Sequence, residues 1–172
     1  MKQMKFLCAL LALILVFTGC AAGQKQPEVK KEDHLYFTAN GTEVAMNAQA
    51  QPVLDALGAS FGMTEEAGCA TSDTVRTYNY GSFYLNVYRT EDGNRIYGAW
   101  FTDEKVSTAE GIHIGSTTQE VTAAYGNVEN TSCGDYNYGS CIVTKGEEML
   151  YILLENDAVT SIQYSVAGGK GC

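Results

Sequence analysis

Few side chains in this sequence of 172 residues could perform acid–base or nucleophilic chemistry. Catalysis by a serine or cysteine nucleophile needs a histidine as its base, and the chain has only His34 and His113. His34 lies in a polar N-terminal segment. His113 alternates with Ile112 and Ile114, so we expect it to point outward from a strand. The sequence therefore predicts no catalytic residue and a protein that is not an enzyme.

The acidic side chains include four neighbouring pairs, most of them in expected turns. Adjacent residues on a chain face different ways, so these pairs are poor general acid–base dyads. Their spacing matches no EF-hand calcium loop, and the chain has no Cys-x-x-Cys metal or redox motif. We therefore expect no resident metal or cofactor. The pairs are Glu65 with Glu66, Glu91 with Asp92, Asp103 with Glu104, and Glu147 with Glu148.

The six cysteines are the remaining reactive side chains, and Cys8 belongs to the N-terminal apolar run. One more, Cys20, ends that N-terminal segment. The other four are Cys69, Cys133, Cys141 and Cys172. Outside the cytoplasm, four cysteines favour two disulfides, with three possible pairings. We favour Cys133 with Cys141, which bracket a Gly- and Tyr-rich stretch, and this leaves Cys69 with Cys172. Alternatively, Cys69 and Cys133 meet each other.

The first twenty residues have the pattern of an export signal. Two lysines precede the apolar run of residues 6–17, which is too short to cross a bilayer as a helix. Small residues then lead to Cys20. This pattern resembles the lipobox of bacterial lipoproteins, which implies removal of residues 1–19 and acyl chains, palmitate among them, on Cys20. The alternative is an ordinary secretory signal cleaved near Ala21 and Ala22.

The net charge of the chain is −9, and its distribution is uneven. We interpret residues 20–35 as the lipidated cysteine and a flexible polar tether with balanced charges. Loss of residues 1–19 removes two lysines, so nine basic residues remain against 20 acidic ones, a net charge of −11. Such acidity argues against binding to nucleic acid and favours solubility of an exported domain.

An internal repeat organises the rest of the chain. Residues 44–58 match residues 112–126, and both segments end at a glycine. Val53, Ala56 and Leu57 have helical spacing, as have their equivalents in the second segment. We therefore predict two short helices that end before Gly58 and Gly126. Thr117 and Glu120 have the spacing of a capping box at the start of the second helix.

Period-two patterns follow each predicted helix. Phe83, Leu85 and Val87 alternate with more polar positions, which is typical of a half-buried strand. Residues 91–94 and 155–157 have the composition of hairpin turns. We predict an α+β fold of two tandem repeats, residues 36–103 and 104–167, each a short helix packed on antiparallel strands. Residues 168–172 form a tail.

The alternation also predicts an exposed aromatic face on the sheet. If Phe83, Leu85 and Val87 face the helices, then Tyr84, Tyr88 and Trp100 face the other way. Tyr and Trp dominate binding hot spots, so these three residues are a candidate partner-binding face. The alternative is that Trp100 is buried and the tyrosines are ordinary strand residues.

Residues 36–166 resemble a family of exported lipoproteins common in Gram-positive, clostridia-like bacteria. The most specific part is the stretch T-A-E-G-I-H-I-G-S, residues 108–116, followed by Val121 and Ala124-Tyr-Gly126; Cys69 and Tyr78-Asn-Tyr80 also match. More remotely, the repeated unit is similar to β-lactamase inhibitory proteins and to small outer-membrane assembly lipoproteins of the SmpA/OmlA type. The resemblance implies a non-enzymatic, protein-binding surface domain. It does not imply inhibition of β-lactamases, because a fold does not carry a function.

These observations together predict a lipoprotein anchored by Cys20 on the extracytoplasmic face of the cell membrane. Its expected role is non-catalytic binding of an envelope or extracellular protein. The alternative is a receptor for a small ligand or ion, bound in a cleft between the repeats.

Overall fold

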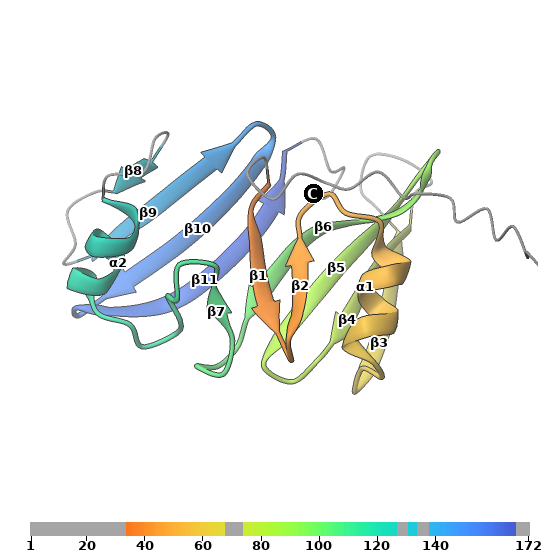
Figure 1. The fold of residues 1–172 in the computed structure, drawn as a ribbon, viewed down its shortest axis with the longest axis horizontal. Helices are drawn as coiled ribbons and strands as arrows, with labels where there is room; N and C mark the ends of the chain where they lie inside the picture. Colours follow the sequence, from red (N-terminus) through yellow and green to blue (C-terminus); the bar gives the residue numbers. More distant parts are fainter. Residues whose placement is uncertain (1–33, 68–73, 127–130, 134–137, 168–172) are drawn as a thin grey trace, which may run out of the picture.

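The computed structural model describes residues 34–67, 74–126, 131–133 and 138–167, and one large antiparallel sheet of eight strands dominates it (Figure 1). The strand order is β3-β4-β5-β6-β11-β10-β9-β8. The strands are β3 Gly62–Ala67, β4 Thr74–Asn79, β5 Phe83–Thr90, β6 Gly93–Phe101, β8 Thr131–Cys133, β9 Tyr138–Lys145, β10 Glu148–Glu155 and β11 Ala158–Val166.

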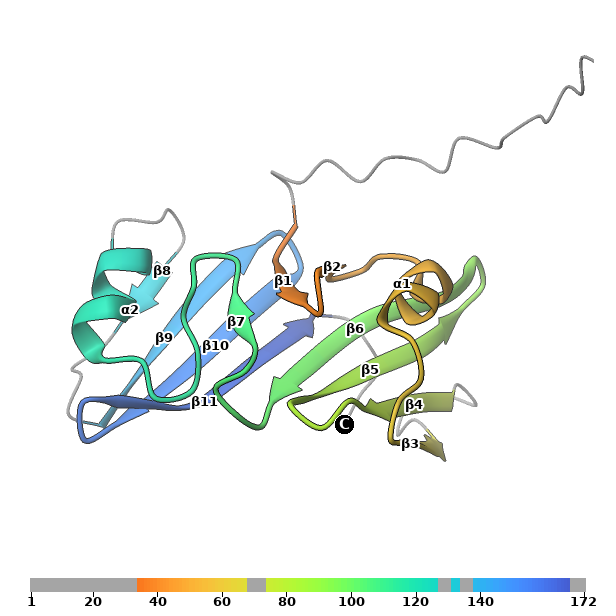
Figure 2. The same cartoon turned by 60° about the horizontal axis from the view of Figure 1, so that its bottom comes forward.

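A second layer covers one face of this sheet. It consists of a small sheet, in the order β2-β1-β7, with a two-turn helix on either side (Figures 1 and 2). Figure 2 shows all these elements on the same side, which leaves the opposite face of the large sheet without a covering element among the described residues. The elements are β1 Tyr36–Ala39, β2 Thr42–Ala45, β7 Ser107–Thr108, α1 Ala50–Leu57 and α2 Thr118–Tyr125.

The prediction of an α+β fold of tandem repeats is wrong. Strands hold 56% of the described residues, and the only two helices among those residues are eight residues long. The segments following α1 and α2 do not form separate layers, because β6 and β11 pair and join their strands into one sheet. In addition, β1, β2 and β7 rather than a helix cover the middle of that sheet.

The helix ends are as predicted, because their signals are local. The Thr117 side chain accepts a hydrogen bond from the Glu120 amide, and the Glu120 carboxylate accepts one from the Thr117 amide at 2.7 Å. This capping box satisfies amides that the first helical turn leaves unpaired. Helix α1 ends at Gly58, whose φ of +77° favours glycine and whose amide donates to the Leu54 carbonyl.

The predicted strand alternation and both hairpin turns are confirmed. Phe83, Leu85 and Val87 are buried along β5, whereas the residues between them are half-buried. The turn between β10 and β11 is formed by Asn156 and Asp157, whose φ values of +52° and +64° suit Asn and Asp in a tight hairpin. The turn between β5 and β6 likewise falls within residues 91–94.

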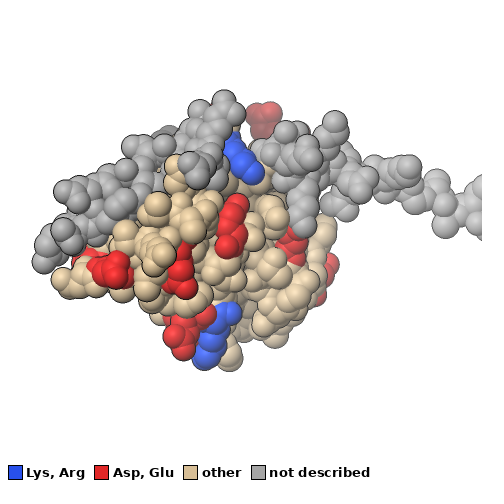
Figure 3. All heavy atoms as spheres, turned by 60° about the vertical axis from the view of Figure 1, so that its left-hand side comes forward, with Lys and Arg blue, Asp and Glu red and all other residues tan. Residues whose placement is uncertain are grey.

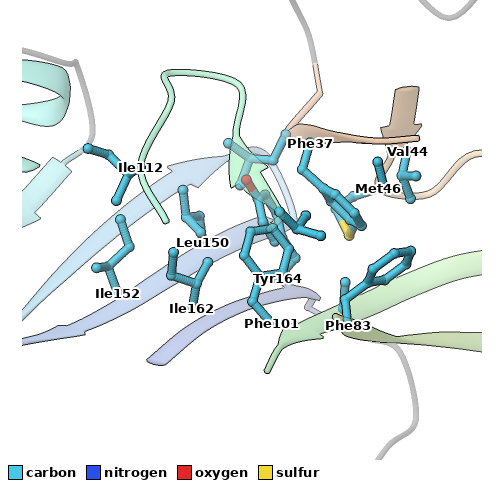
Figure 4. Close-up of a cluster of buried hydrophobic side chains, with 14 of the residues drawn as sticks. Phe37, Val44, Met46, Phe83, Phe101, Ile112, Leu150, Ile152, Ile162 and Tyr164 are labelled. Atoms are coloured by element: carbon cyan, nitrogen blue, oxygen red, sulfur yellow. The ribbon is translucent and has the colours of Figure 1, made fainter. Parts of the chain in front are cut away.

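A continuous hydrophobic core lies between the two layers (Figure 4). Phe37 of β1 is at its centre, with its ring centroid 5.3 Å from that of Phe83 and 5.0 Å from that of Phe101. On the other side, its ring packs against Tyr164 of β11. Since burial of each such side chain contributes about 1.5–3 kcal/mol, one shared core holds both halves of the sheet together.

Candidate binding face

A row of large side chains crosses the uncovered face of the eight-stranded sheet. Tyr84 lies opposite Trp100, Trp100 opposite Gln163, Gln163 opposite Tyr151, and Tyr151 opposite Ile142, on five consecutive strands from β5 to β9. Their neighbours along each strand include the buried core residues of the other face. The register therefore assembles one line of apolar and amide side chains from segments far apart in the sequence.

A second row runs parallel to this one and is more polar. It is formed by Thr64, Thr77, Asn86, Gly98, Ser165, Met149 and Thr144, again in register across the strands. Thr77 donates a hydrogen bond to Asn86 at 3.0 Å. The first row continues from Tyr84 to Asn79 of β4 and Gly62 of β3. We call these two rows the open face.

The two rows of the open face carry no charged residue; on the same side of the sheet, Glu66 is the next residue of β3 beyond Thr64. This is notable because 18% of the chain is charged, and acidic residues outnumber basic ones by 20 to 11. Figure 3 shows acidic side chains spread over one end of the molecule, with few basic ones among them. The open face instead offers aromatic, amide and hydroxyl groups.

Of the three predicted face residues, Tyr84 and Trp100 lie in the first row, whereas Tyr88 lies beyond the second row on β5; Trp100 is exposed. Half of the Trp100 surface, 50%, is accessible to solvent, so the alternative of a buried tryptophan is wrong. Its ring centroid lies 6.2 Å from that of Tyr84, which is within the range of aromatic contact. Tyr88 is instead paired edge-to-face with Tyr97, at 5.4 Å, farther along the same strands.

Tyr97 adds a hydroxyl group to this second aromatic pair. Partial burial, and then the nearby carboxylate of Glu66, raise the pKa of Tyr97. The phenol therefore stays protonated at neutral pH and retains its ability to donate a hydrogen bond. Tyr88 and Tyr97 thus form a second aromatic pair, nearer the hairpin turn between β5 and β6.

Sequence reasoning missed Tyr151, Gln163 and Ile142. Tyr151 had a readable signal, because it alternates with Leu150 and Ile152 and so had to face away from the core. Its position in line with Trp100 depends on the pairing of β6 with β11. That register cannot be read from local patterns.

A polar cluster lies between the layers, at the start of β1. Glu148 is only 4% exposed, and its carboxylate accepts a hydrogen bond from the Leu35 amide at 2.6 Å and contacts Nδ1 of His34. His34 and Leu35, expected in the tether, thus contact the described domain. A buried carboxylate needs such partners, so this cluster fixes the beginning of β1 on β10.

Two acid–base expectations need correction at this point. Glu148, expected in a turn, is buried at the first position of β10, and its alternation with Leu150, Ile152 and Leu154 was the missed signal. His113 does not lie in a strand. It precedes α2, and its Nδ1 atom is 2.9 Å from the Ile114 carbonyl oxygen.

A shallow pocket adjoins the Glu148 cluster. Its lining includes His34, Glu110, Lys145 and Tyr164, and it has room for about one water molecule. A pocket of this size does not hold an organic ligand, since such sites are typically about 300–1,000 Å³. Within the part of the chain that the structure describes, no group of three His, Cys, Asp or Glu side chains is arranged to hold a metal ion.

Of the six cysteines, Cys133 and Cys141 lie within the described residues. Cys141 is buried in β9 and is disulfide-bonded. Cys133 of β8 lies directly opposite Cys141 in the strand register, which is a backbone spacing that a disulfide can bridge. The Cys133–Cys141 pairing stays a prediction. Cys20, Cys69 and Cys172 lie outside the described residues, and so do the predicted signal, most of the tether and the tail.

Comparisons with known proteins add little to this geometry. No family model matches the chain, and no curated protein does. A solved structure of a cysteine-rich secretory protein from Staphylococcus aureus is similar, with 10% sequence identity and a TM-score of 0.44. The match covers 70% of this chain and 44% of that one. Across the described ranges, no helix is both long and apolar enough to cross a membrane.

Proposed function

We propose that this chain is a lipoprotein, anchored by acyl chains on Cys20 outside the cytoplasm, that binds a partner protein without catalysis. The partner binds to the open face of the eight-stranded sheet. The observation that carries the proposal is the uncharged row of aromatic and amide side chains around Trp100, on an otherwise acidic molecule.

The composition of the open face supports a protein partner. The centres of protein interfaces are depleted of charged residues and enriched in Tyr and Trp. Antibody paratopes combine the same aromatic residues with Ser, Gly and Asn, which provide adaptable hydrogen bonds. The open face has this mixture, with Trp100 and Tyr84 beside Asn86, Gly98 and Ser165.

The shape of the open face favours a protein over a small ligand. Neighbouring strands lie about 4.8 Å apart, so an eight-stranded sheet extends about 34 Å across. A surface of that width can supply the roughly 800 Å² that each partner buries in a typical interface. Small-molecule sites are concave and enclose their ligands, whereas no element among the described residues covers this face of the sheet (Figure 2).

Photo-crosslinking of the full-length protein in its native envelope tests the proposal. A photoreactive phenylalanine analogue replaces Tyr84 or Tyr151 on the open face, and Gln51 on the exposed side of α1 serves as control. We expect a discrete protein adduct from the two open-face positions and none from Gln51. Adducts that are identical from all three positions would place the partner elsewhere.

A substitution experiment then identifies the side chains involved. The adduct partner is purified, and its affinity is measured for the wild type and for Tyr84→Ala/Tyr88→Ala/Trp100→Ala. We expect the triple substitution to weaken binding by more than about tenfold, as loss of hot-spot residues does. The control is Gln51→Ala on the exposed side of α1. Equal weakening by the control would place the contact outside the open face.

The anchor has its own test. Cys20→Ala removes the sulfur that would carry diacylglycerol. We expect the wild type to incorporate labelled palmitate and to fractionate with the membrane, and the variant to do neither. Unchanged labelling of the variant would rule out Cys20 as the site of lipidation without affecting the proposal for the open face.

A further inference from the structure

Strand β3 forms one edge of the eight-stranded sheet and is exposed over its whole length. It pairs on one side with β4 in six consecutive residue pairs, and no strand among the described residues pairs with its other side. The edge of a sheet presents unpaired N–H and C=O groups that can pair with another strand. Natural proteins usually protect such edges with charged side chains, lysine above all, or with proline, a bulge or a very short strand.

Of these protective devices, β3 has only charged side chains, Glu65 and Glu66. The strand Gly62–Ala67 has neither lysine nor proline, and its pairing with β4 shows no register shift. The edge is therefore regular and six residues long, which suits the addition of a further strand.

Exposed hydrophobic side chains gather at the beginning of the same strand. Phe61 is 84% exposed and Met63 is 49% exposed, so two of the three large, exposed hydrophobic residues in the described chain are here. The third, Trp100, belongs to the open face. Exposed apolar side chains beside an unpaired edge indicate a binding site rather than a solvated strand.

The two faces of β3 differ in chemistry. The face shared with the core carries Met63, Glu65 and Ala67, and the carboxylate of Glu65 is neutralised by Arg76 at 2.7 Å. The other side of β3, which continues the open face, carries Thr64 and Glu66. Glu66 forms no ion pair with a described residue. One face thus accepts apolar side chains, and the other attracts a positive charge.

We infer that β3 binds an extended segment of a partner protein, in which basic and apolar residues alternate, as an additional strand of the sheet. Backbone hydrogen bonds to the β3 edge provide the pairing. The apolar side chains of the segment contact Met63 and Ala67, and a Lys or Arg lies beside Glu66. A second copy of this chain is a poor occupant, because β3 carries two glutamates and like charges on adjacent strands are destabilising.

Fluorescence anisotropy with a defined peptide tests this site. The probe is a labelled octapeptide of alternating Lys and Val, titrated with the full-length protein in detergent micelles. One control peptide has N-methyl groups on alternate amides, which prevents strand pairing, and another has Glu in place of Lys. We expect saturable binding of the Lys/Val peptide only. Equal binding of the N-methylated peptide, or no saturable binding of the Lys/Val peptide, would overturn the inference.

Two substitutions locate the peptide on β3. We expect Glu66→Gln to weaken binding about two- to fivefold, since an exposed ion pair contributes modestly, and Met63→Lys to weaken it further by removing apolar contact and adding a like charge. Glu155→Gln removes one carboxylate at the far end of β10 and serves as the matched control. If Glu155→Gln has the same effect as Glu66→Gln, binding follows net charge and the inference is wrong. Photo-crosslinking from the open face is independent of this outcome.

Discussion

Trp100 illustrates what a single residue contributes to the proposed function. It is the only tryptophan of the chain, half of its surface is exposed, and it lies between Tyr84 and Gln163 on the open face. Its orientation followed from alternation with the buried Ala99 and Phe101, which is a local pattern. Its exposure could not be predicted, because that depends on whether any element covers the face.

Tyr125 is the residue for which the structure makes the clearest prediction about stability. Its hydroxyl is within hydrogen-bond distance of the Glu110 carboxylate, at 2.6 Å, and of the Thr108 hydroxyl, at 2.7 Å. We expect Tyr125→Phe to lower the free energy of unfolding by about 1–2 kcal/mol, because a charge-assisted hydrogen bond is lost. Urea denaturation measures this. Tyr84→Phe, on the open face, serves as control and should change stability by less than about 0.5 kcal/mol; equal effects would contradict the account.

Alkaline pH should reveal the same buried phenol. Burial and the Glu110 carboxylate raise the pKa of Tyr125, and burial raises that of Tyr164. Since the folded-state pKa exceeds the unfolded value of 10.0, the stabilisation is complete below pH 10 and is lost as the pH rises toward the folded-state pKa. We expect the Tm to fall above pH 10, and to fall less steeply in Tyr125→Phe. Identical slopes in both proteins would exclude a contribution from Tyr125.

Among the elements, α2 depends on its capping box. We expect Thr117→Ala to lower stability by about 1 kcal/mol, because the amide of Glu120 loses its acceptor, whereas Thr117→Ser should retain most of it. Hydrogen bonds from the backbone amide and side chain of Thr117 lower the pKa of Glu120. Its contribution is therefore present above pH 4.5 and lost as the pH falls through the lowered pKa.

Denaturation at neutral and at acidic pH checks this prediction for α2. The difference between wild type and Thr117→Ala should shrink at acidic pH, where Glu120 is protonated. A difference of the same size at both pH values would mean that the hydrogen bond from the Thr117 hydroxyl to Glu120 does not contribute to the cap.

The elements also show which parts of the fold could be predicted. Both helix ends and the hairpin turns were predictable, because a few adjacent residues determine them. Strand β3 was not, since all six of its residues are exposed and give no alternation; it exists because it pairs with β4. The small sheet was also missed, because β1 meets β7 only through pairs such as Phe37 with Thr108, far apart in sequence.

At the scale of the whole molecule, the junction between β6 and β11 joins the two halves of the large sheet. It consists of three residue pairs, and one of them includes Gly98. A Cβ atom on Gly98 would lie 2.8 Å from the Tyr164 carbonyl oxygen of β11. The close approach of these backbones therefore requires glycine at this position.

Substitution of Gly98 tests the importance of this junction. We expect Gly98→Ala to destabilise the protein by about 1–3 kcal/mol, as overpacking does. In contrast, Gly62→Ala should be nearly neutral, because a Cβ there meets no atom within 4 Å. Unfolding in urea, followed by circular dichroism, compares the two variants. Equal stabilities would mean that the junction tolerates separation of β6 from β11.

The same junction explains why only part of the candidate site could be predicted. Tyr84, Tyr88 and Trp100 follow one another in neighbouring strands of a hairpin, so their shared face was readable. Gln163, Tyr151 and Ile142 join them through the β6–β11 register. The acidity of the chain was evident from composition, but the absence of charge from the open face emerges only when both halves form one sheet.

The fluorescence of Trp100 in the presence of the crosslinked and purified partner tests the central claim most directly. The partner is titrated into the full-length protein and into Trp100→Phe, and the difference between the two spectra isolates the emission of Trp100. Binding to the open face should shift this emission to shorter wavelength and protect it from acrylamide quenching, because the exposed half of the ring loses contact with water. A saturated complex in which neither property changes would contradict the assignment of the open face as the binding surface.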